Sequence, residues 1–508
     1  MIGRVAEIQE LRRAYASEES EFVAVYGRRR IGKTYLINEV FNARFTFHAV
    51  GMEKGKKREQ LEAFQDSLRR QGWPKCPRLS SWIAAFSQLE QMLEASTASR
   101  KVVFLDELPW FDSPCSGFLA AFERFWNGWA CLRKDVLLIV CGSATTWIVD
   151  SVLKSRGGLH NRVTRRLHLK PFTLRECEDY AAYRGLGMDR RQLLECYMAL
   201  GGVAYYWTLL QEGISAAQNF DRMFFGEFDE MREEFDRVFA SLYRSPTMHV
   251  AIVRILGTLK TGMTRDEIVH SLGTESSGDV TECLKELVQC GFVRHCNAIG
   301  KAKYGGLYQL IDPYCLFYFE FLEQRRGNDA HYWTRNYNSP KVNGWRGRAF
   351  ERVCFWHVSE IKDRLGISGI EADVYSWQGR VGADSEKVQI DLLIDRADGV
   401  VDVCEIKYSD EPYELKKDEN ENIARRVAAF REHAHQRKSV RTVLIASSGL
   451  KAGKYNGNIM AVNDVACVIL PNGRHFCLAV FIKDAQCSMA RCEELIATMA
   501  QKCFEYFY

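Results

Sequence analysis

The stretch VAVYGRRRIGKTYLI, residues 23–37, constrains the fold more strongly than any other part of this 508-residue chain. The apolar run 22–26 predicts a buried strand, and the amphipathic segment 33–41 predicts a helix. The loop between them has the spacing G-x-x-x-x-G-K-[ST], with its fixed positions at Gly27, Gly32, Lys33 and Thr34. Such a loop wraps backbone N–H groups around phosphate oxygens, so Lys33 is expected to reach the β and γ phosphates of a nucleotide and Thr34 a Mg²⁺ ion.

Two later segments predict more of the same site. KVVFLDELPWFD contains a buried strand, 102–105, that ends in Asp106 and Glu107. Parallel strands bring such residues to the carboxyl edge of the sheet, where Asp106 would hold Mg²⁺ through water and Glu107 would polarise the attacking water. VLLIVCGSATTWI predicts another strand, 136–141, with Ser143 at the same edge, where its hydroxyl can sense the γ-phosphate. The expected fold class is α/β, a P-loop NTPase with a parallel sheet.

Composition limits the class of protein. No apolar run approaches the length that spans a bilayer, and the first residues lack the apolar core of a signal peptide, so we expect a cytoplasmic protein with no membrane partner. The 17 cysteines form no C-x-x-C pair, which favours reduced, buried thiols over disulfides or a zinc site. A net charge of +4 gives no nucleic-acid footprint by itself.

Four segments together resemble the AAA-type, STAND-related ATPases of archaea and bacteria, namely IGRVAEIQELRR, GRRRIGKT, VVFLDELPWF and HNRVTRRLHLKPFTLRECEDY. The resemblance covers roughly residues 1–460 and implies that the nucleotide is ATP. In such ATPases an arginine after the sensor strand can contact the γ-phosphate. By position this implies Arg162, ahead of Arg165 and Arg166, and a local cap or salt bridge is the alternative role.

The resemblance also bears on the three consecutive arginines, Arg28 to Arg30. They resemble the usual filling of this loop, so we expect at least one to face solvent or a neighbouring domain rather than phosphate. One departure from the family follows the core. ALGGVAYYW carries Ala204 where these ATPases often have the proline of a Gly-Gly-x-Pro turn, so the helical lid is expected to couple to the nucleotide differently.

Residues 245–311 have the pattern helix, helix, helix and β-hairpin, which is typical of a winged helix-turn-helix. Thr264 and Glu267 form a capping box at the second helix, and Gly291 ends the third. The third helix is acidic, with Asp279, Glu282 and Glu286 against Lys285, while Arg294, Lys301 and Lys303 lie on the wing. Because phosphates repel an acidic helix, internal packing or partner binding is favoured over direct reading of DNA.

Beyond an aromatic helix and a polar connector, the strands VQIDLLIDR and VVDVCEIKYS carry Asp391 and the pair Glu405-x-Lys407. Residues two apart on a strand project from one face. With Glu351 on the preceding helix, this set resembles the catalytic core of PD-(D/E)xK nucleases, in which Asp391 and Glu405 would hold Mg²⁺ and Lys407 would orient or deprotonate water. An ion-paired, solvated strand face is the alternative interpretation.

The expected domains are an ATPase core at 1–185, a helical lid at 186–244, a winged helix-turn-helix at 245–311, a helical connector at 312–343, a restriction-endonuclease-like α/β domain at 344–470, and a hairpin and helix tail at 471–508. The tail, over about residues 458–505, resembles the end of class A β-lactamases, with no other support for that activity. Two functions remain open. One is an ATP-driven switch that controls a nuclease acting on nucleic acid. The other is a nucleotide-gated scaffold or regulator whose silent C-terminal domain binds DNA or a protein partner, and the expected partners include a second copy of the chain in a homo-oligomer.

Overall fold

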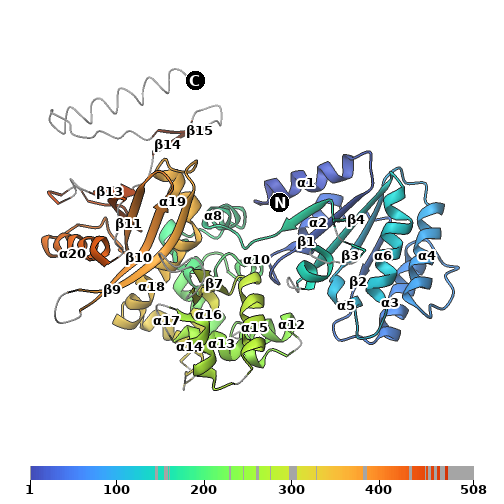
Figure 1. Ribbon diagram of the computed structural model, residues 1–508, viewed down its shortest axis with the longest axis horizontal. Coiled ribbons are helices and arrows are strands. Elements are labelled where there is room, and N and C mark those ends of the chain that lie inside the picture. The colour runs from blue at the N-terminus through green and yellow to red at the C-terminus, as the bar shows by residue number, and fades with distance from the viewer. Residues whose placement is uncertain are drawn as a thin grey trace. The chain divides into compact units, whose positions relative to one another are not determined.

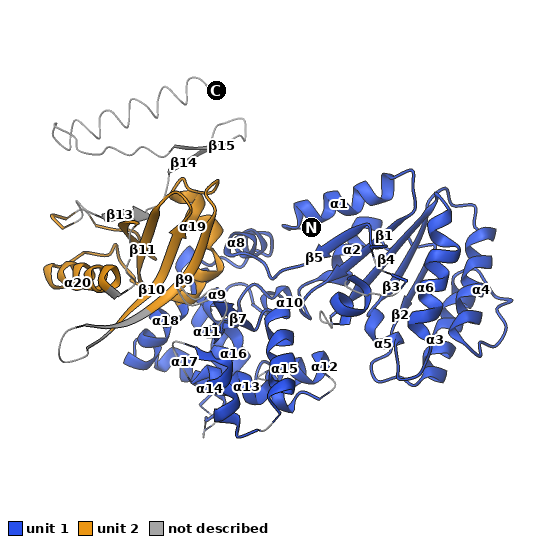
Figure 2. Ribbon diagram, in the orientation of Figure 1, with its two compact units in different colours: residues 1–297, 303–349 blue, residues 298–302, 350–508 orange. Residues whose placement is uncertain are grey.

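The structure is a computed structural model. It describes residues 2–478 except 144–146, 154–157, 160, 228–229, 244, 259–261, 275, 297–305, 326, 328, 382–385, 434–437, 452, 456–458, 463–465 and 470–474. The chain divides into two compact units, residues 1–297 with 303–349 and residues 298–302 with 350–508 (Figure 2). Among the helices of the described part, none combines the length and the apolar character needed to cross a membrane.

The first unit begins with a five-stranded sheet in the order β2-β3-β4-β1-β5, with every neighbouring pair parallel. The strands are β1 Glu21–Tyr26, β2 Phe47–Val50, β3 Lys101–Asp106, β4 Val136–Gly142 and β5 Arg165–His168. The apolar runs of β3 and β4 are buried along their whole length, because helices cover both faces of such a sheet. The three predicted strands, at 22–26, 102–105 and 136–141, are confirmed to within two residues.

Alternate side chains of each strand supply two separate cores. Phe22 and Ala24 face a core shared with helices α3 Lys57–Arg70, α4 Trp82–Ala95 and α6 Phe118–Gly128. Val23 and Val25 face the other, shared with α1 Val5–Ala16 and α2 Lys33–Phe41. Figure 1 shows these two helix groups on opposite faces of the sheet. The predicted helix 33–41 matches α2, and the loop before it lies at the carboxyl edge of β1.

A run of short helices follows the sheet. They are α8 Leu174–Tyr183, α9 Arg190–Leu200, α10 Ala204–Thr208, α11 Ala216–Phe220, the π-helix η3 Asp221–Phe225 and α12 Glu234–Leu242. The backbone comes very close to itself where this run meets the sheet domain, since a Cβ added to Gly202 would lie 1.8 Å from the Phe172 carbonyl oxygen. Only glycine fits at that position.

Residues 247–310 form three helices and a small sheet. The helices are α13 Thr247–Gly257, α14 Arg265–Leu272 and α15 Ser277–Gln289, and the sheet has the order β6-β8-β7, with β6 Met263–Thr264, β7 Val293–Cys296 and β8 Leu307–Leu310. The predicted capping box of Thr264 and Glu267 is confirmed, and Gly291 has a φ of +76° after α15. Strand β6 was not predicted, because two residues are too few to show a period-2 pattern.

Aromatic helices link this segment to the second unit. They are α16 Pro313–Phe317, the π-helix η4 Tyr318–Leu322, α17 Tyr332–Arg335 and α18 Pro340–Trp356. The polar connector predicted after the aromatic helix is partly helical, because α18 already begins at Pro340, a residue well suited to a first helical turn.

The second unit holds a mixed sheet in the order β13-β12-β11-β10-β9. Its elements are α19 Val358–Arg364, β9 Ala372–Val381, β10 Glu386–Arg396, β11 Val400–Lys407, α20 Lys417–His433, β12 Ser439–Ala446 and β13 Ile459–Val462. Strands β9, β10 and β11 are antiparallel, whereas β11, β12 and β13 are parallel. A hairpin of β14 Ala466–Ile469 and β15 His475–Leu478 follows, and the predicted tail helix lies outside the described residues.

Candidate nucleotide site and candidate metal site

The phosphate loop has the backbone conformation that its glycines allow. Gly27 has a φ of +144° and Gly32 a φ of +89°, and a Cβ added to Gly27 would lie 2.2 Å from the Leu169 carbonyl oxygen. Arg30 also has a positive φ, +67°, which is unusual for a residue with a side chain. The loop is therefore a tight cradle that ends at the N-terminus of α2, where backbone N–H groups and the helix dipole favour an anion.

Five of the predicted residues meet at the carboxyl edge of the sheet. The buried Lys33 ammonium donates to the carbonyls of Gly27 at 3.0 Å and Arg28 at 2.8 Å, and to Ser143 Oγ at 3.2 Å. Thr34 Oγ1 donates to Asp106 Oδ2 at 2.8 Å. Lys33 is thus linked to the end of β4, and Thr34 to the end of β3.

Glu107 is held in one orientation at this edge. Ser143 donates to it twice, from Oγ to Oε1 at 2.7 Å and from its backbone N–H to Oε2 at 3.1 Å. Its own N–H donates to Asp106 Oδ1 at 2.9 Å, and its φ of +48° is left-handed. Strained backbone that the surroundings hold in place is common where a side chain must be aimed. The arrangement can position a carboxylate beside a phosphate and Mg²⁺ site.

Two of the three loop arginines pair with acidic residues of distant segments. Arg28 is buried and pairs with Asp312, and Arg30 pairs with Glu234. These pairs agree with the prediction that at least one loop arginine faces solvent or a neighbouring domain rather than phosphate, since Arg28 and Arg30 both contact segments beyond the sheet.

The predicted γ-phosphate arginine, Arg162, is exposed, as is Arg166, whereas Arg165 is partly buried. Arg162 lies in the turn before β5, where its backbone N–H donates to the Leu159 carbonyl at 3.1 Å. Arg165 forms ion pairs with Glu10 at 2.7 Å and Glu21 at 3.1 Å. A structural role therefore accounts for Arg165, and the role of Arg162 stays a prediction.

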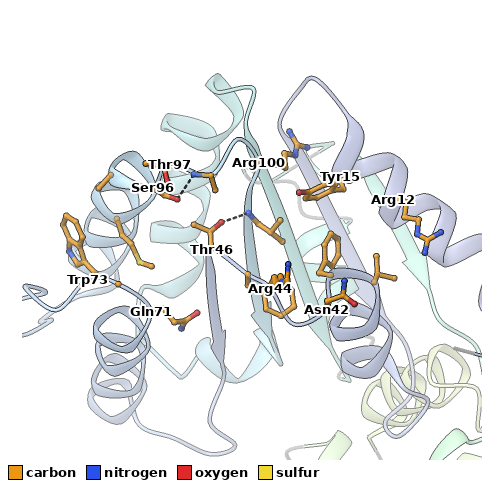
Figure 3. A pocket seen from close by; sticks show the side chains of 18 residues that line it. Arg12, Tyr15, Asn42, Arg44, Thr46, Gln71, Trp73, Ser96, Thr97 and Arg100 are labelled. Carbon is orange, nitrogen blue, oxygen red and sulfur yellow. Dashed lines mark hydrogen bonds between the residues drawn. The ribbon is translucent and has the colours of Figure 1, made fainter.

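A cavity of about 860 Å³ opens at the opposite edge of this sheet (Figure 3). It lies beside Thr46 and Val102, at the amino ends of β2 and β3, and is lined by aromatic rings such as Tyr15 and Trp73. It contains none of the predicted site residues. The phosphate loop and the strand ends therefore locate the nucleotide site, and this cavity is a separate feature of the sheet domain.

In the second unit, the predicted carboxylates lie on neighbouring strands. Leu392 pairs with Cys404 across β10 and β11, so Asp391 and Glu405 occupy the next antiparallel position. The pairing of β9 with β10 shifts register between Ile390 and Leu393, and such bulges often redirect a side chain near a site. Glu351 lies on α18, and both it and Asp391 act electrostatically on the buried Cys354 thiol.

Charges around Asp391 change its acidity. Its pKa is raised from 3.8 to about 6, chiefly by burial and then by the Glu405 carboxylate, while Arg426 and Lys407 oppose the rise. Gln389 Nε2 donates to Asp391 Oδ1 at 3.1 Å. Paired acids whose charges disfavour each other are a common feature of metal sites, because a divalent cation relieves the repulsion.

Glu405 already has two cationic partners. Arg426 Nη1 donates to its two oxygens at 2.9 and 2.7 Å, and Lys407 Nζ lies 3.0 Å from Oε1. Arg426, which lies on α20, was not among the predicted site residues. Its position could have been inferred from spacing. Arg426 lies three positions after the buried Ile423, so both residues lie on the same face of α20.

Among the described residues, a second cluster has metal-ligating types, His249, Cys283 and Glu286. His249 Nε2 lies 2.5 Å from Glu286 Oε2, and Nδ1 lies 3.8 Å from Cys283 Sγ. Burial raises the pKa of the Cys283 thiol to about 11. Both ring nitrogens already have hydrogen-bond partners and the thiol is protonated at neutral pH, so we interpret this cluster as a hydrogen-bonded buried histidine.

Comparison with known proteins agrees with the first site. Residues 1–210 match a family described as an ATPase domain predominantly from Archaea. An uncharacterized protein of Methanocaldococcus jannaschii is 24% identical over 335 residues, which cover 63% of this chain and 68% of that protein. The extended-spectrum β-lactamase PER-1 of Pseudomonas aeruginosa is 40% identical over 60 residues, only 12% of this chain and 18% of that enzyme.

Solved structures show weaker likeness. The Walker-type ATPase of Pyrococcus abyssi has a TM-score of 0.46 at 16% identity, covering 63% of this chain and 96% of that one. The Aeropyrum pernix ORC2 protein has a TM-score of 0.39 at 16% identity, covering 63% and 93%. Since these TM-scores lie below 0.5, the evidence for an ATPase domain is the family match of residues 1–210 and the phosphate loop from Gly27 to Thr34. Residues 1–210 are a P-loop ATPase domain, which binds and hydrolyses ATP.

Proposed function

We propose that the chain is an ATP-driven switch in which the ATPase domain controls a Mg²⁺-dependent nuclease-like domain that acts on nucleic acid in the cytoplasm. In this proposal Lys33 and Thr34 hold the phosphates and Mg²⁺, Asp106 holds the ion through water, and Glu107 polarises the attacking water. The ATPase part of the proposal is supported by the hydrogen bonds that join Lys33 to Ser143 and Ser143 to Glu107.

The segment 247–310 supports a winged helix-turn-helix. Its helix, strand, helix, helix, strand, strand order and its sheet order β6-β8-β7 fit that motif. Its third helix, α15, argues against reading DNA directly. Lys285 bonds to Glu282 at 2.9 Å and to Asp150 of the ATPase domain at 3.1 Å, and Arg294 donates to Gln309 at 2.6 Å. Lys301 and Lys303 lie outside the described residues. We therefore favour internal signal transfer for this segment.

The nuclease-like role rests on the second unit. Asp391, Glu405 and Lys407 lie on adjacent strands, with Glu351 on the helix that precedes them. Carboxylate oxygens of this kind suit Mg²⁺, and the ion would stabilise charge on an attacked phosphate. Lys407 is available to orient water next to it.

A first experiment tests the ATPase and its link to nucleic acid. Purified wild type is compared with Lys33→Ala for Mg²⁺-dependent ATP hydrolysis, with and without single- or double-stranded DNA. Lys101→Ala is the matched control, because Lys101 is also 5% exposed but pairs with Asp135 at the amino end of β3. Hydrolysis that is lost only in Lys33→Ala and stimulated by DNA supports the proposal. Hydrolysis indifferent to DNA removes the nucleic-acid part.

One observation favours the second candidate, a nucleotide-gated scaffold with a silent C-terminal domain. Both oxygens of Glu405 accept from Arg426 Nη1, so a metal ion must displace this ion pair before it can bind there. Mg²⁺-dependent cleavage of DNA or RNA that disappears in Asp391→Ala and Lys407→Ala decides for the nuclease. Retained binding of DNA or a protein partner, with no cleavage in any nucleotide state, decides for the scaffold.

A further inference from the structure

Two arginines of the phosphate loop, Arg28 and Arg30, form ion pairs away from the expected phosphate position. Arg28 is 4% exposed and Asp312, its partner, 1%. The Arg28 guanidinium also lies 4.4 Å from the centre of the Phe292 ring. Burial lowers the pKa of Arg28, but the charge of Asp312 and its hydrogen bond raise it by more, so Arg28 keeps its charge. Phosphate binding does not require this buried contact, so its role lies with its partners, Asp312 and Phe292.

Asp312 and Phe292 belong to one local structure at the base of the 247–310 segment. The N–H groups of Ile311 and Asp312 donate to the Phe292 carbonyl at 2.9 and 3.3 Å. Asp312 Oδ1 also caps α16 by accepting from the Cys315 N–H at 2.8 Å. Arg28 therefore ties the phosphate loop to the point where β7, β8 and α16 meet.

Arg30 makes a parallel connection to the lid helices. Its guanidinium pairs with Glu234 of α12 and lies 4.4 Å from the Tyr205 ring centre, and its carbonyl accepts from the Tyr205 N–H at 3.1 Å. Tyr206 OH donates to the same Glu234 at 2.9 Å. These contacts hold Arg30 in its left-handed conformation, which has an intrinsic cost for a residue with a Cβ. The proline position of the related turn, here Ala204, begins the helix that contains Tyr205.

We propose that Arg28 and Arg30 are positioning residues that couple nucleotide binding in the phosphate loop to the lid and to the segment 247–312. This proposal rests on the proposed ATP switch, and it identifies the two ion pairs through which the nucleotide would act on the other segments. The two ion pairs hold the loop backbone in the cradle conformation, so any shift of that backbone on phosphate binding must move Asp312 or Glu234. Coupling of this kind is reciprocal, so weakening a pair weakens nucleotide binding.

The test removes one charge and keeps the shape. Glu234→Gln can still accept from Tyr206 but loses its ion pair with Arg30. The matched control is Glu195→Gln, because Glu195 is equally buried in a pair with Arg346 at 2.7 Å, on the same run of helices but with no contact to the phosphate loop in the described residues. Affinity for a fluorescent ATP analogue is expected to fall about fivefold or more in Glu234→Gln and less than twofold in the control.

A double-mutant cycle separates positioning from loss of stability. Arg30→Gln, which changes a side chain 24% exposed, and Arg30→Gln with Glu234→Gln are expected to bind the analogue as weakly as Glu234→Gln, because all three lack the same pair. If Glu234→Gln does not fold, Arg30→Gln tests the pair from its partly exposed side. Additive losses, or equal losses in Glu195→Gln, overturn the coupling.

A second measurement follows the signal at its far end. In wild type, ATP is expected to change hydrogen exchange of peptides from β8, the start of α16 and α12, and the response of α12 is expected to shrink in Glu234→Gln and Arg30→Gln. Wild type that binds no nucleotide refutes the switch and the coupling together. Wild type that binds ATP without any response at β8, or variants within twofold of its affinity, refutes the coupling alone.

Discussion

Ser143 donates two hydrogen bonds to Glu107, one to each carboxylate oxygen, at 2.7 and 3.1 Å. The same Ser143 hydroxyl accepts from Lys33. A single side chain from the end of β4 therefore touches both the lysine expected at the phosphates and the carboxylate expected at the attacking water. A phosphate bound at Lys33 can therefore affect the orientation of Glu107 through Ser143.

Ser143→Ala tests that relationship. The variant keeps the backbone hydrogen bond to Glu107 but loses the hydroxyl, so Glu107 is held less well, while Lys33 keeps its two carbonyl acceptors in the loop. We expect kcat for ATP hydrolysis to fall by about tenfold to a hundredfold, with the affinity for nucleotide changed by less than about threefold. Ser67→Ala is the control, because the Ser67 hydroxyl donates to the Ala63 carbonyl of its own helix, α3, at 3.0 Å. An unchanged kcat would show that the backbone N–H suffices.

Asp391 gives the second unit a predictable pH dependence. Its pKa is raised to about 6, chiefly by burial, so between pH 4 and pH 6 the folded protein holds a proton that the unfolded chain has lost. Stability therefore falls as pH rises through this window, by at most about 3 kcal/mol. Asp391→Asn is expected to raise the unfolding temperature of this unit above pH 6 and to change little below pH 4, as measured by calorimetry.

Asp398→Asn is the control of opposite sign. Hydrogen bonding to Arg396 holds the pKa of Asp398 below its ordinary value, so its charged form supports the fold above the ordinary pKa of an aspartate. Replacing it is expected to lower the unfolding temperature at neutral pH. A stability profile of Asp391→Asn that runs parallel to wild type from pH 4 to pH 7 would contradict the proposed burial of that charge.

The fold of the ATPase domain was predictable because its signals are local. A buried parallel strand needs only a short apolar run, and the helix after the loop is fixed by its glycine and lysine, so β1, β3, β4 and α2 were found from the sequence. The strand ends then placed Asp106, Glu107 and Ser143 at one edge without any knowledge of tertiary contacts.

The partners of the loop arginines could not be predicted in the same way. Arg28 and Asp312 are 284 residues apart in sequence, and nothing in either local pattern selects the other. The same holds for Arg30 with Glu234 and for Glu195 with Arg346, which join distant segments. Long-range ion pairs depend on how helices pack, and that packing is decided by the shape of aromatic cores rather than by period or spacing.

The pair of Glu195 and Arg346 makes a prediction about stability. Both side chains are 1% exposed, and Arg346 also donates to the Tyr337 carbonyl at 2.8 Å. Arg346→Met leaves the Glu195 charge buried without its partner, and we expect the first unit to lose about 3–5 kcal/mol of unfolding free energy. Denaturant unfolding followed by tryptophan fluorescence measures the loss.

Its control removes both charges at once. The double variant Glu195→Leu with Arg346→Met leaves no unpaired ion, so it is expected to recover a large part of the loss. A single variant as stable as wild type would mean that water reaches Glu195, which contradicts its burial.

Arg426 makes the last prediction, because it competes with any metal ion for Glu405. It donates to both oxygens, at 2.9 and 2.7 Å, from a helix position 21 residues away. Arg426→Gln removes that competing charge, so if Asp391 and Glu405 form a metal site, Mn²⁺ used as a probe for Mg²⁺ is expected to bind at least about tenfold more tightly, as read by calorimetry or electron paramagnetic resonance.

The gain should vanish when Asp391→Ala is added to Arg426→Gln, because one carboxylate of the pair is then gone. Arg425→Gln is the matched control, since Arg425 is the preceding residue of the same helix and bonds to Asn422 at 3.1 Å. Equal Mn²⁺ affinity in wild type and Arg426→Gln would mean that Glu405 is not a ligand. The second unit would then be a binding domain whose acidic residues serve the fold, and the scaffold function would be favoured.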